Sequence, residues 1–304
     1  MAISHYLKDI GRGKEGARSL DRTQAADLLG QVLDGTASDL EVGAFCIAMR
    51  VKGETPEEMA GFLDAVHERM EMLPASRRPL VVLPSYNGAR KLPVLTPLLA
   101  MLLARRGLPV LVHGTATEDR RVGSQDVLAT LGVSAMQALG TIEPGEVAFA
   151  PTALLLPGLE RLLDVRRTLG LRNSAHSIVK LMDPLLPVAG DSLIVSSYTH
   201  PKYAASMAAT LTLTGADALL LRGTEGEPVA DPRRKPQMDG FVAGHPQRLQ
   251  EAQGGPLAAL PSLPTAIDAA STAAWIRSVL DGTQPVPAPI ALQVEHILHL
   301  TRAM

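Results

Sequence analysis

The sequence contains one cysteine, Cys46, and this scarcity excludes both an internal disulfide framework and a metal site made of several cysteines. Aromatic residues amount to 3%, against 46% hydrophobic residues, so the core has to be aliphatic. No apolar run approaches the length of about 18 residues that a membrane-spanning helix needs. The first residues, MAISHYLKDIG, contain no apolar signal segment. We therefore expect a cytoplasmic protein without a membrane partner, in which Cys46 is a buried thiol on an apolar helix.

Acidic residues are missing from one long stretch of the chain. The net charge of −2 gives no global argument for a polyanionic partner, but no Asp or Glu stands between Glu71 and Glu118. The cations in this acid-free stretch are Arg77, Arg78, Arg90, Lys91, Arg105 and Arg106. Two interpretations stay open: the charges are scattered over solvated faces, or they form a local field that binds anions.

Helical signals fill the first part of the chain, residues 1–74. Three helices are expected to start after the N-cap candidates Asp21, Ser38 and Thr55. The third start is the best defined, because Pro56 takes the first helical position and Glu58 stands three residues after the cap, which is a capping box.

Beyond residue 75 the hydrophobic period changes. Short β-rich runs, LVVL, PVLVHG, VAFA, DSLIVSS and ADALLLRG, alternate with helical stretches. The expected helices span residues 94–106, 124–131, 158–169, 200–213, about 266–280 and about 289–303. This alternation predicts an α/β domain over residues 75–304, with a mainly parallel sheet flanked by helices. Residues 223–264 are rich in Gly, Pro and charge, so mostly loops are expected there.

The segment LEVGAFCIAMRVKGETPEEMAGFLDA, residues 40–65, resembles the N-terminal helical domain of anthranilate phosphoribosyltransferases and their nucleoside-phosphorylase relatives. Later segments follow the order of that family, among them GSQDVLATLG and RRTLGLRNSAHSIVKLMDP. The resemblance implies a small helical domain, residues 1–74, joined by helices from about 166–190. It also implies that this domain forms a homodimer and that the α/β domain has the phosphoribosyltransferase fold.

The first loop of the α/β domain departs from the family motif. In the enzymes a GTGGD segment offers its backbone N–H groups to the pyrophosphate of phosphoribosyl pyrophosphate, and this chain has PSYNGAR there. Pro84 has no N–H, and Tyr86 blocks a close approach of the backbone. The family's adjacent Asp-Glu pair, which holds magnesium, is replaced by a separated Glu225 and Glu227. No metal or cofactor is therefore expected, and magnesium only if transferase activity is retained.

At other positions of the enzyme motifs His113 and Ser124 match, Arg121 stands at the family's lysine, and Arg166 falls where the enzymes use an arginine. If the chain is a glycosyl or phosphoribosyl transferase acting on an unusual substrate, the resemblance assigns the chemistry to His113, Arg121, Ser124 and Arg166. As a lone histidine at a strand end, His113 is otherwise a structural hydrogen-bonding group. This transferase stays the alternative function.

Four segments together, PSYNGARK, LRNSAHSIVKL, SYTHPKY and LLLRGTEGEPVADPRR, resemble the YbiB-type branch of this fold, which is associated with nucleic-acid binding. The resemblance implies a largely sequence-independent protein that binds DNA or RNA through phosphates. The candidate anion-binding residues are Asn87, Gly88, Arg90, Lys91, Arg172, Asn173, His176, Lys180, His200, Lys202, Arg233 and Arg234. Arg90 and Lys91 are expected near the first turn of the next helix, where cations oppose the helix dipole.

Two tyrosines leave the choice between core and surface open. Tyr198 and Tyr203 flank the Thr-His-Pro-Lys run that begins a predicted helix. Aromatic rings beside a lysine suit stacking on unpaired bases. The alternative is that both rings fill an otherwise aliphatic core.

Overall fold

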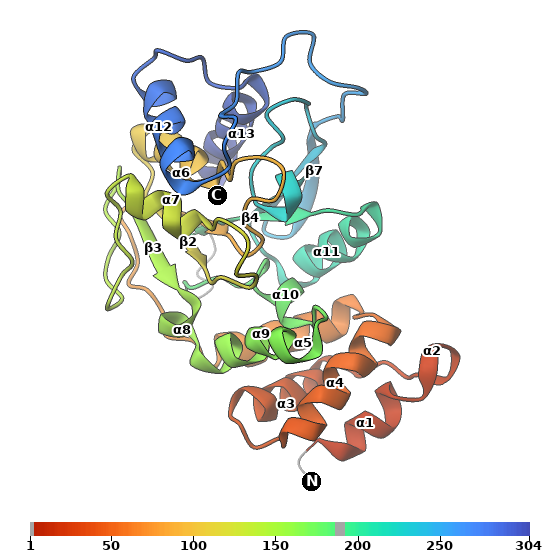
Figure 1. The fold of residues 1–304 in the computed structure, drawn as a ribbon. Helices are drawn as coiled ribbons and strands as arrows, with labels where there is room; N and C mark the ends of the chain where they lie inside the picture. The colour runs from red at the N-terminus through yellow and green to blue at the C-terminus, as the bar shows by residue number, and fades with distance from the viewer. Residues whose placement is uncertain (1–2, 186–191) are drawn as a thin grey trace.

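A computed structural model describes residues 3–185 and 192–304 and arranges them as a helical layer beside a seven-stranded sheet (Figure 1). The helical layer contains α1 (Ser4–Ile10), α2 (Gly13–Gly16), α3 (Arg22–Leu33), α4 (Asp39–Lys52) and α5 (Pro56–His67). Asp21, Ser38 and Thr55 each accept a hydrogen bond from the backbone N–H three residues ahead, and each closes a capping box. All three predicted helix starts are confirmed.

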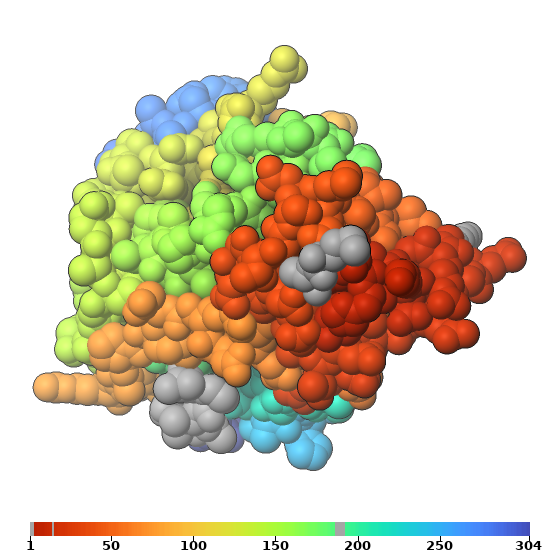
Figure 2. Space-filling view, turned by 90° about the horizontal axis from the view of Figure 1, so that it is seen from below, coloured from red at the N-terminus to blue at the C-terminus, as the bar shows by residue number. Residues whose placement is uncertain are grey.

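A later part of the chain returns to this layer. The helices α8 (Thr152–Leu155), α9 (Pro157–Leu169) and α10 (Ala175–Ile178) follow β3, and α9 and α10 contact α3 and α5. Gly158 permits the close approach, because a Cβ there would lie 2.4 Å from the carbonyl oxygen of Leu33. Figure 2 shows α9 (green) against the N-terminal helices (red). Of the predicted helices over 166–190, residues 186–190 lie outside the described residues, and the domain boundary at 74/75 stays a prediction.

The sheet is mainly parallel, as predicted. Its order is β3-β2-β1-β4-β5-β6-β7, and the first five strands in this order run parallel. The strands are β1 (Leu80–Pro84), β2 (Val110–Gly114), β3 (Val147–Pro151), β4 (Ser192–Tyr198), β5 (Ala218–Arg222), β6 (Met238–Val242) and β7 (His245–Gln250). In a parallel sheet all carboxyl ends meet at one edge, where ligands usually bind. The loops after β1, β2, β4 and β5 therefore share one edge.

The expectation of mostly loops over residues 223–264 is wrong for its middle part. There β6 and β7 form an antiparallel hairpin that extends the sheet beyond β5. The two turn residues, Ala243 and Gly244, have φ values of +47° and +75°, as a two-residue turn between twisted strands requires. Because alanine rarely takes a positive φ, the pair Ala-Gly gave no hairpin signal.

Helices cover both faces of the sheet. They are α6 (Thr96–Arg105), α7 (Ser124–Thr130), α11 (Pro201–Thr214), α12 (Ala269–Leu280) and α13 (Ala288–Ala303). Val82 of β1 belongs to a core shared with the helical layer, whereas Val81 and Leu83 belong to a core with α6, α12 and α13. Both cores are mainly aliphatic, and Cys46 is buried in the first, which raises the pKa of its thiol to about 11.

The start of α6 corrects one expectation. It begins at Thr96, so Arg90 and Lys91 precede it by more than one turn and do not oppose its dipole. No helix within residues 3–185 and 192–304 is long and apolar enough to cross a membrane.

Candidate functional site

The loops at the carboxyl edge of the sheet are in direct contact. The first loop, residues 85–92 after β1, pairs with the loop after β2 through the N–H of Ala89, which lies 2.8 Å from the carbonyl oxygen of Val122. Gly226, after β5, lies against Asn87 and Thr199: a Cβ built on it would be 1.9 Å from Nδ2 of Asn87. Residues from four loops therefore meet around Asn87.

Glu227 fills the inner part of the first loop. It is buried, and its carboxylate accepts hydrogen bonds from the backbone N–H groups of Asn87 at 2.8 Å and Gly88 at 2.9 Å. The hydroxyls of Ser85 and Thr96 donate to the same carboxylate. These N–H groups belong to the segment that the resemblance aligns with the pyrophosphate cradle. Here a carboxylate of the same chain occupies them.

Glu225 fills the outer part of the same loop. Its carboxylate accepts from the N–H groups of Arg90 at 2.8 Å, Lys91 at 3.0 Å and Leu92 at 3.4 Å. The segment of residues 225–227 thus supplies two carboxylates to one loop, and Gly226 between them lets the backbone pass against Asn87.

These two carboxylates do not fit a magnesium ion. Their oxygens face N–H and O–H donors, and a cation placed among those donors would be repelled by their positive ends. Among the described residues no group of three His, Cys, Asp or Glu side chains is placed to hold a metal. The loop has the donor chemistry of an anion site.

Three arginines converge beside the first loop. Arg121 and Arg166 both pair with Glu118, and a guanidinium nitrogen of Arg121 lies 3.0 Å from the carbonyl oxygen of Asn87. Arg172 donates to Oδ1 of Asn87 at 2.6 Å. Burial lowers the pKa of Arg172, and the charges of Arg166 and Arg121 lower it further. One carboxylate therefore balances three neighbouring guanidinium groups, which leaves the cluster cationic.

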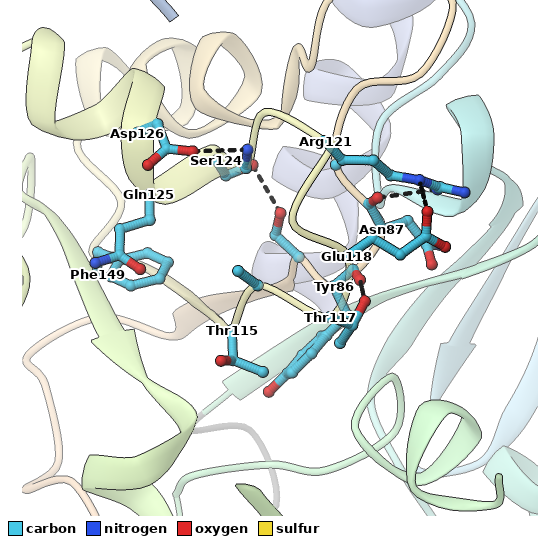
Figure 3. Close-up of a pocket in the computed structure, with 14 residues that line it drawn as sticks. Tyr86, Asn87, Thr115, Thr117, Glu118, Arg121, Ser124, Gln125, Asp126 and Phe149 are labelled. Atoms are coloured by element: carbon cyan, nitrogen blue, oxygen red, sulfur yellow. Dashed lines mark hydrogen bonds and ion pairs between the residues drawn. The ribbon is translucent and has the colours of Figure 1, made fainter. Parts of the chain in front are cut away.

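A cavity of about 50 Å³ opens between the loops after β1 and β2 (Figure 3). Asn87, Glu118 and Arg121 lie on one side of it, and Gln125 and Phe149 lie on the opposite side. This volume holds a few water molecules but lies far below the few hundred Å³ of typical small-ligand sites.

Of the residues that stand at enzyme motif positions, His113 lies in the core and Ser124 lies at the cavity. His113 is buried, with its Nδ1 2.8 Å from the hydroxyl of Tyr86, which also lies 2.9 Å from the hydroxyl of Thr152. Burial lowers the pKa of His113 to about 3, so the ring is neutral at pH 7. Ser124 is buried too, and its hydroxyl lies 2.7 Å from the hydroxyl oxygen of Ser85, to which it donates because the Ser85 proton goes to Glu227. His113 and Thr152 thus anchor the first loop inside the protein through the hydroxyl of Tyr86.

Several candidate anion-binding residues are engaged inside the protein. Lys180 donates to the carbonyl oxygens of Ser197 at 3.0 Å and Gly226 at 2.8 Å. Asn173 donates to the carbonyl oxygen of Leu162, and neighbouring His176 is buried, which lowers its pKa to about 3. These residues hold the 172–180 segment against α9, β4 and the turn after β5.

Other candidates lie on the surface. Arg233 and Arg234 both pair with Asp231, so that cluster carries only one net positive charge. His200 caps α11 by accepting from the N–H of Lys202 at 3.3 Å.

The exposed charged groups of Arg90, Lys91 and Lys202 have no hydrogen-bond or ion-pair partner within the part of the chain that the structure describes.

The two tyrosines take different places. Tyr198 is buried, as the core interpretation predicts, whereas Tyr203 on the first turn of α11 is 54% exposed. Only Tyr203 presents its ring to solvent, next to Lys202.

Sequence reasoning missed Glu118 and the role of the 225–227 segment. Glu118 is one of two acids, with Asp119, at the end of the acid-free stretch, and nothing in the sequence pairs it with Arg166, 48 residues away. Glu225 and Glu227 are noticeable only because they replace an adjacent acidic pair.

The chain is similar to known proteins of one family. Residues 4–70 match the helical bundle domain of a glycosyl transferase family. The chain is 39% identical to the uncharacterized Escherichia coli protein YbiB, over 97% of this chain and 92% of that protein. It is 33% identical to the anthranilate phosphoribosyltransferase of Anaeromyxobacter dehalogenans, over 62% of this chain and 55% of that enzyme.

Solved structures show the same fold. The anthranilate phosphoribosyltransferase from Thermus thermophilus superposes with a TM-score of 0.74 at 24% identity, covering 96% of this chain and 85% of that one. The enzyme from Saccharomyces cerevisiae, solved with PRPP and Mg, gives a TM-score of 0.69 at 16% identity, over 99% and 88% of the two chains.

Proposed function

We propose that this chain, which belongs to the family of the Escherichia coli protein YbiB and has the anthranilate phosphoribosyltransferase fold, binds nucleic acid through its phosphates. The observation that carries the proposal is the cationic cluster of Arg121, Arg166 and Arg172 beside the first loop, with Glu118 as its counter-charge. The exposed groups of Arg90 and Lys91 extend it. A cytoplasmic location, where DNA and RNA are accessible, is part of the proposal.

The chemistry of this surface favours backbone contacts over base reading. Guanidinium and ammonium groups pair with phosphates whatever the base sequence, and affinity then depends strongly on salt. Tyr203, exposed beside Lys202, adds a ring on which an unpaired base can stack. Single strands are therefore the preferred ligand in this proposal.

A transferase is the second candidate. Its support is the matched family and a cavity that keeps Arg121 and Ser124 next to the first loop. Against it, Glu225 and Glu227 occupy the N–H groups that a phosphoribosyl pyrophosphate would need. Calorimetric titration with magnesium and phosphoribosyl pyrophosphate separates the candidates, because the usual donor of this enzyme class has to bind before it reacts.

Replacing Arg90 and Lys91 together by alanine should weaken binding to unrelated oligonucleotides about equally. Each lost phosphate contact flattens the slope of log affinity against log salt by about 0.7 to 0.9, so the double variant should lose about one to two units of slope. Fluorescence anisotropy at several salt concentrations measures both quantities. The side chains are exposed, and their backbone N–H groups stay in place, so the melting temperature should not change.

The pair Arg77 and Arg78 provides a matched control. Both are exposed cations, and they precede β1, at the opposite end of the strand from the first loop. If alanine at both positions lowers affinity as much as R90A/K91A does, the effect is one of net charge, and the proposed surface is wrong.

We also propose that a second copy of this chain covers α4. Leu40, Ile47 and Val51 form an exposed apolar stripe along one face of that helix, at 85%, 40% and 54% exposure. Leu171 continues the stripe, because Arg50 at the end of α4 donates to the carbonyl oxygen of Arg172. A stripe of this kind on a small helical layer fits a symmetric dimer contact.

Glutamate at positions 47 and 51 should convert a dimer at micromolar concentration into a monomer, since two charges would be buried in each half of the contact. Light scattering coupled to size exclusion measures the mass. L213E is the control, because Leu213 on α11 is also 40% exposed but lies outside the stripe. A wild-type protein that is monomeric under these conditions would refute the dimer.

A further inference from the structure

The outer end of the first loop has the form of an anion site. The N–H groups of three consecutive residues, Arg90, Lys91 and Leu92, point at one oxygen of Glu225, at 2.8, 3.1 and 3.4 Å. Consecutive N–H groups that converge in this way bind anions, and the side chains of Arg90 and Lys91 add two positive charges. The present occupant of the site is a carboxylate from the same chain, 135 residues further on.

Glu225 occupies this site in a strained arrangement. Its backbone has φ +53° and ψ +19°, the left-handed region that residues with a Cβ avoid. The hydroxyl of neighbouring Thr224 is buried, lines the same small hollow, and is without a hydrogen-bond partner among the residues for which the structure gives positions. An anion that takes the place of this carboxylate would release the side chain of Glu225 from the loop, and its further oxygens would offer the Thr224 hydroxyl an acceptor.

We infer that Glu225 is a displaceable mask over a phosphate site, formed by the N–H groups of residues 90–92 and the side chains of Arg90 and Lys91. The inference rests on the proposed function, because in the cell the displacing group is a phosphodiester of bound nucleic acid. Glu225 is partly exposed and can swing out, whereas Glu227 is buried and held by two N–H groups and two hydroxyls. Only the outer carboxylate therefore exchanges.

Two variants separate unmasking from a simple change of charge. Glu225→Gly and Glu225→Gln each remove one negative charge. The glutamine oxygen still reaches the N–H groups, but glycine leaves them free. Glycine also adopts a positive φ without strain, so the variant keeps the loop conformation.

Inorganic phosphate, added at constant ionic strength, is the first probe, and the amide NMR signals of residues 90 and 91 are the readout. E225G should reach half-saturation at about tenfold lower phosphate concentration than E225Q. In E225G the N–H groups of residues 90–92 are free to make a charge-assisted contact with phosphate, whereas in E225Q the glutamine oxygen still occupies them. A labelled single-stranded oligonucleotide is the second probe. E225G should bind it about tenfold more tightly than wild type, and E225Q about two- to threefold, the effect of one exposed charge.

Equal responses of E225G and E225Q to phosphate would overturn the mask, because charge alone would explain them. If phosphate behaves as expected but neither wild type nor the variants bind the oligonucleotide, the mask stands and the proposed function fails. If E225G does not fold, the wild-type titration decides. Saturating phosphate should shift the amide signals of residues 90 and 91, and unmoved signals would refute the inference.

Discussion

Glu227→Ala should lower the free energy of unfolding by about 3 to 5 kcal/mol, the largest loss expected for any single substitution at this site. The change leaves two N–H groups, of Asn87 and Gly88, and two hydroxyls, of Ser85 and Thr96, without their acceptor in a buried place. Each orphaned buried donor costs about 1 to 3 kcal/mol, less what a water entering the vacated space restores. Urea unfolding followed by circular dichroism measures the loss.

Glu225→Ala is the matched control for this prediction, because it is the same substitution two residues away. The N–H groups that Glu225 caps lie at the protein surface, where water replaces the carboxylate, so a loss below about 1 kcal/mol is expected. If both variants lose the same stability, the inner carboxylate is no more important to the fold than the outer one. The distinction between a fixed Glu227 and an exchangeable Glu225 would then be wrong.

Lys180 should make stability rise with pH between about 8 and 10.5. Burial lowers the pKa of Lys180 from 10.5 to about 8, with Glu227 opposing and Arg172 adding to the shift. Within this window the folded protein has released the proton that the unfolded chain still binds. Because the unfolded state then holds more protons, the free energy of unfolding increases with pH. The gain is fully present above pH 10.5 and is lost as pH falls through 8.

The comparison that isolates this effect is between wild type and Lys180→Met. Cys46 titrates in the same range with the opposite effect, because burial raises its pKa, but it is present in both proteins. The difference in unfolding free energy, wild type minus K180M, should therefore grow by at most about 3 kcal/mol from pH 7.5 to 10.5. Parallel pH profiles, or a labelled Lys180 side chain that titrates at its ordinary value, would contradict the assignment.

The helices and strands whose positions depend on neighbouring residues could be predicted from the sequence. Caps such as Thr55 act within one turn, and each of the five parallel strands contains an apolar run of at least three residues, so these signals are contained in a few neighbouring residues. The hairpin of β6 and β7 was missed because its turn uses Ala243, a residue that seldom accepts a positive φ. The short helices α1 and α2 gave no distinct cap signal either.

The candidate site could be predicted only in part, because its charges come from distant parts of the chain. The acid-free stretch, residues 72–117, is not acid-free in space: Glu225 reaches the N–H groups of Arg90 and Lys91, and Glu295 pairs with Arg106 at 2.7 Å. These contacts span more than a hundred residues, and no periodicity or motif spacing encodes them. The resemblance pointed to the first loop and to the 172–180 segment, which meet where Arg172 donates to Asn87, but not to the carboxylates of Glu225 and Glu227.

The left-handed backbone at Glu225 also has a consequence for how this family can change over generations. A glutamate codon becomes a glycine codon by a single change of its middle base, and glycine is the residue that this backbone conformation favours. The route from an occupied to an open loop is therefore one mutational step with a small folding penalty, because glycine accepts the positive φ and water replaces the carboxylate. A natural relative with glycine at this position is expected to bind anions more tightly, and its neighbours in sequence would need no compensating change.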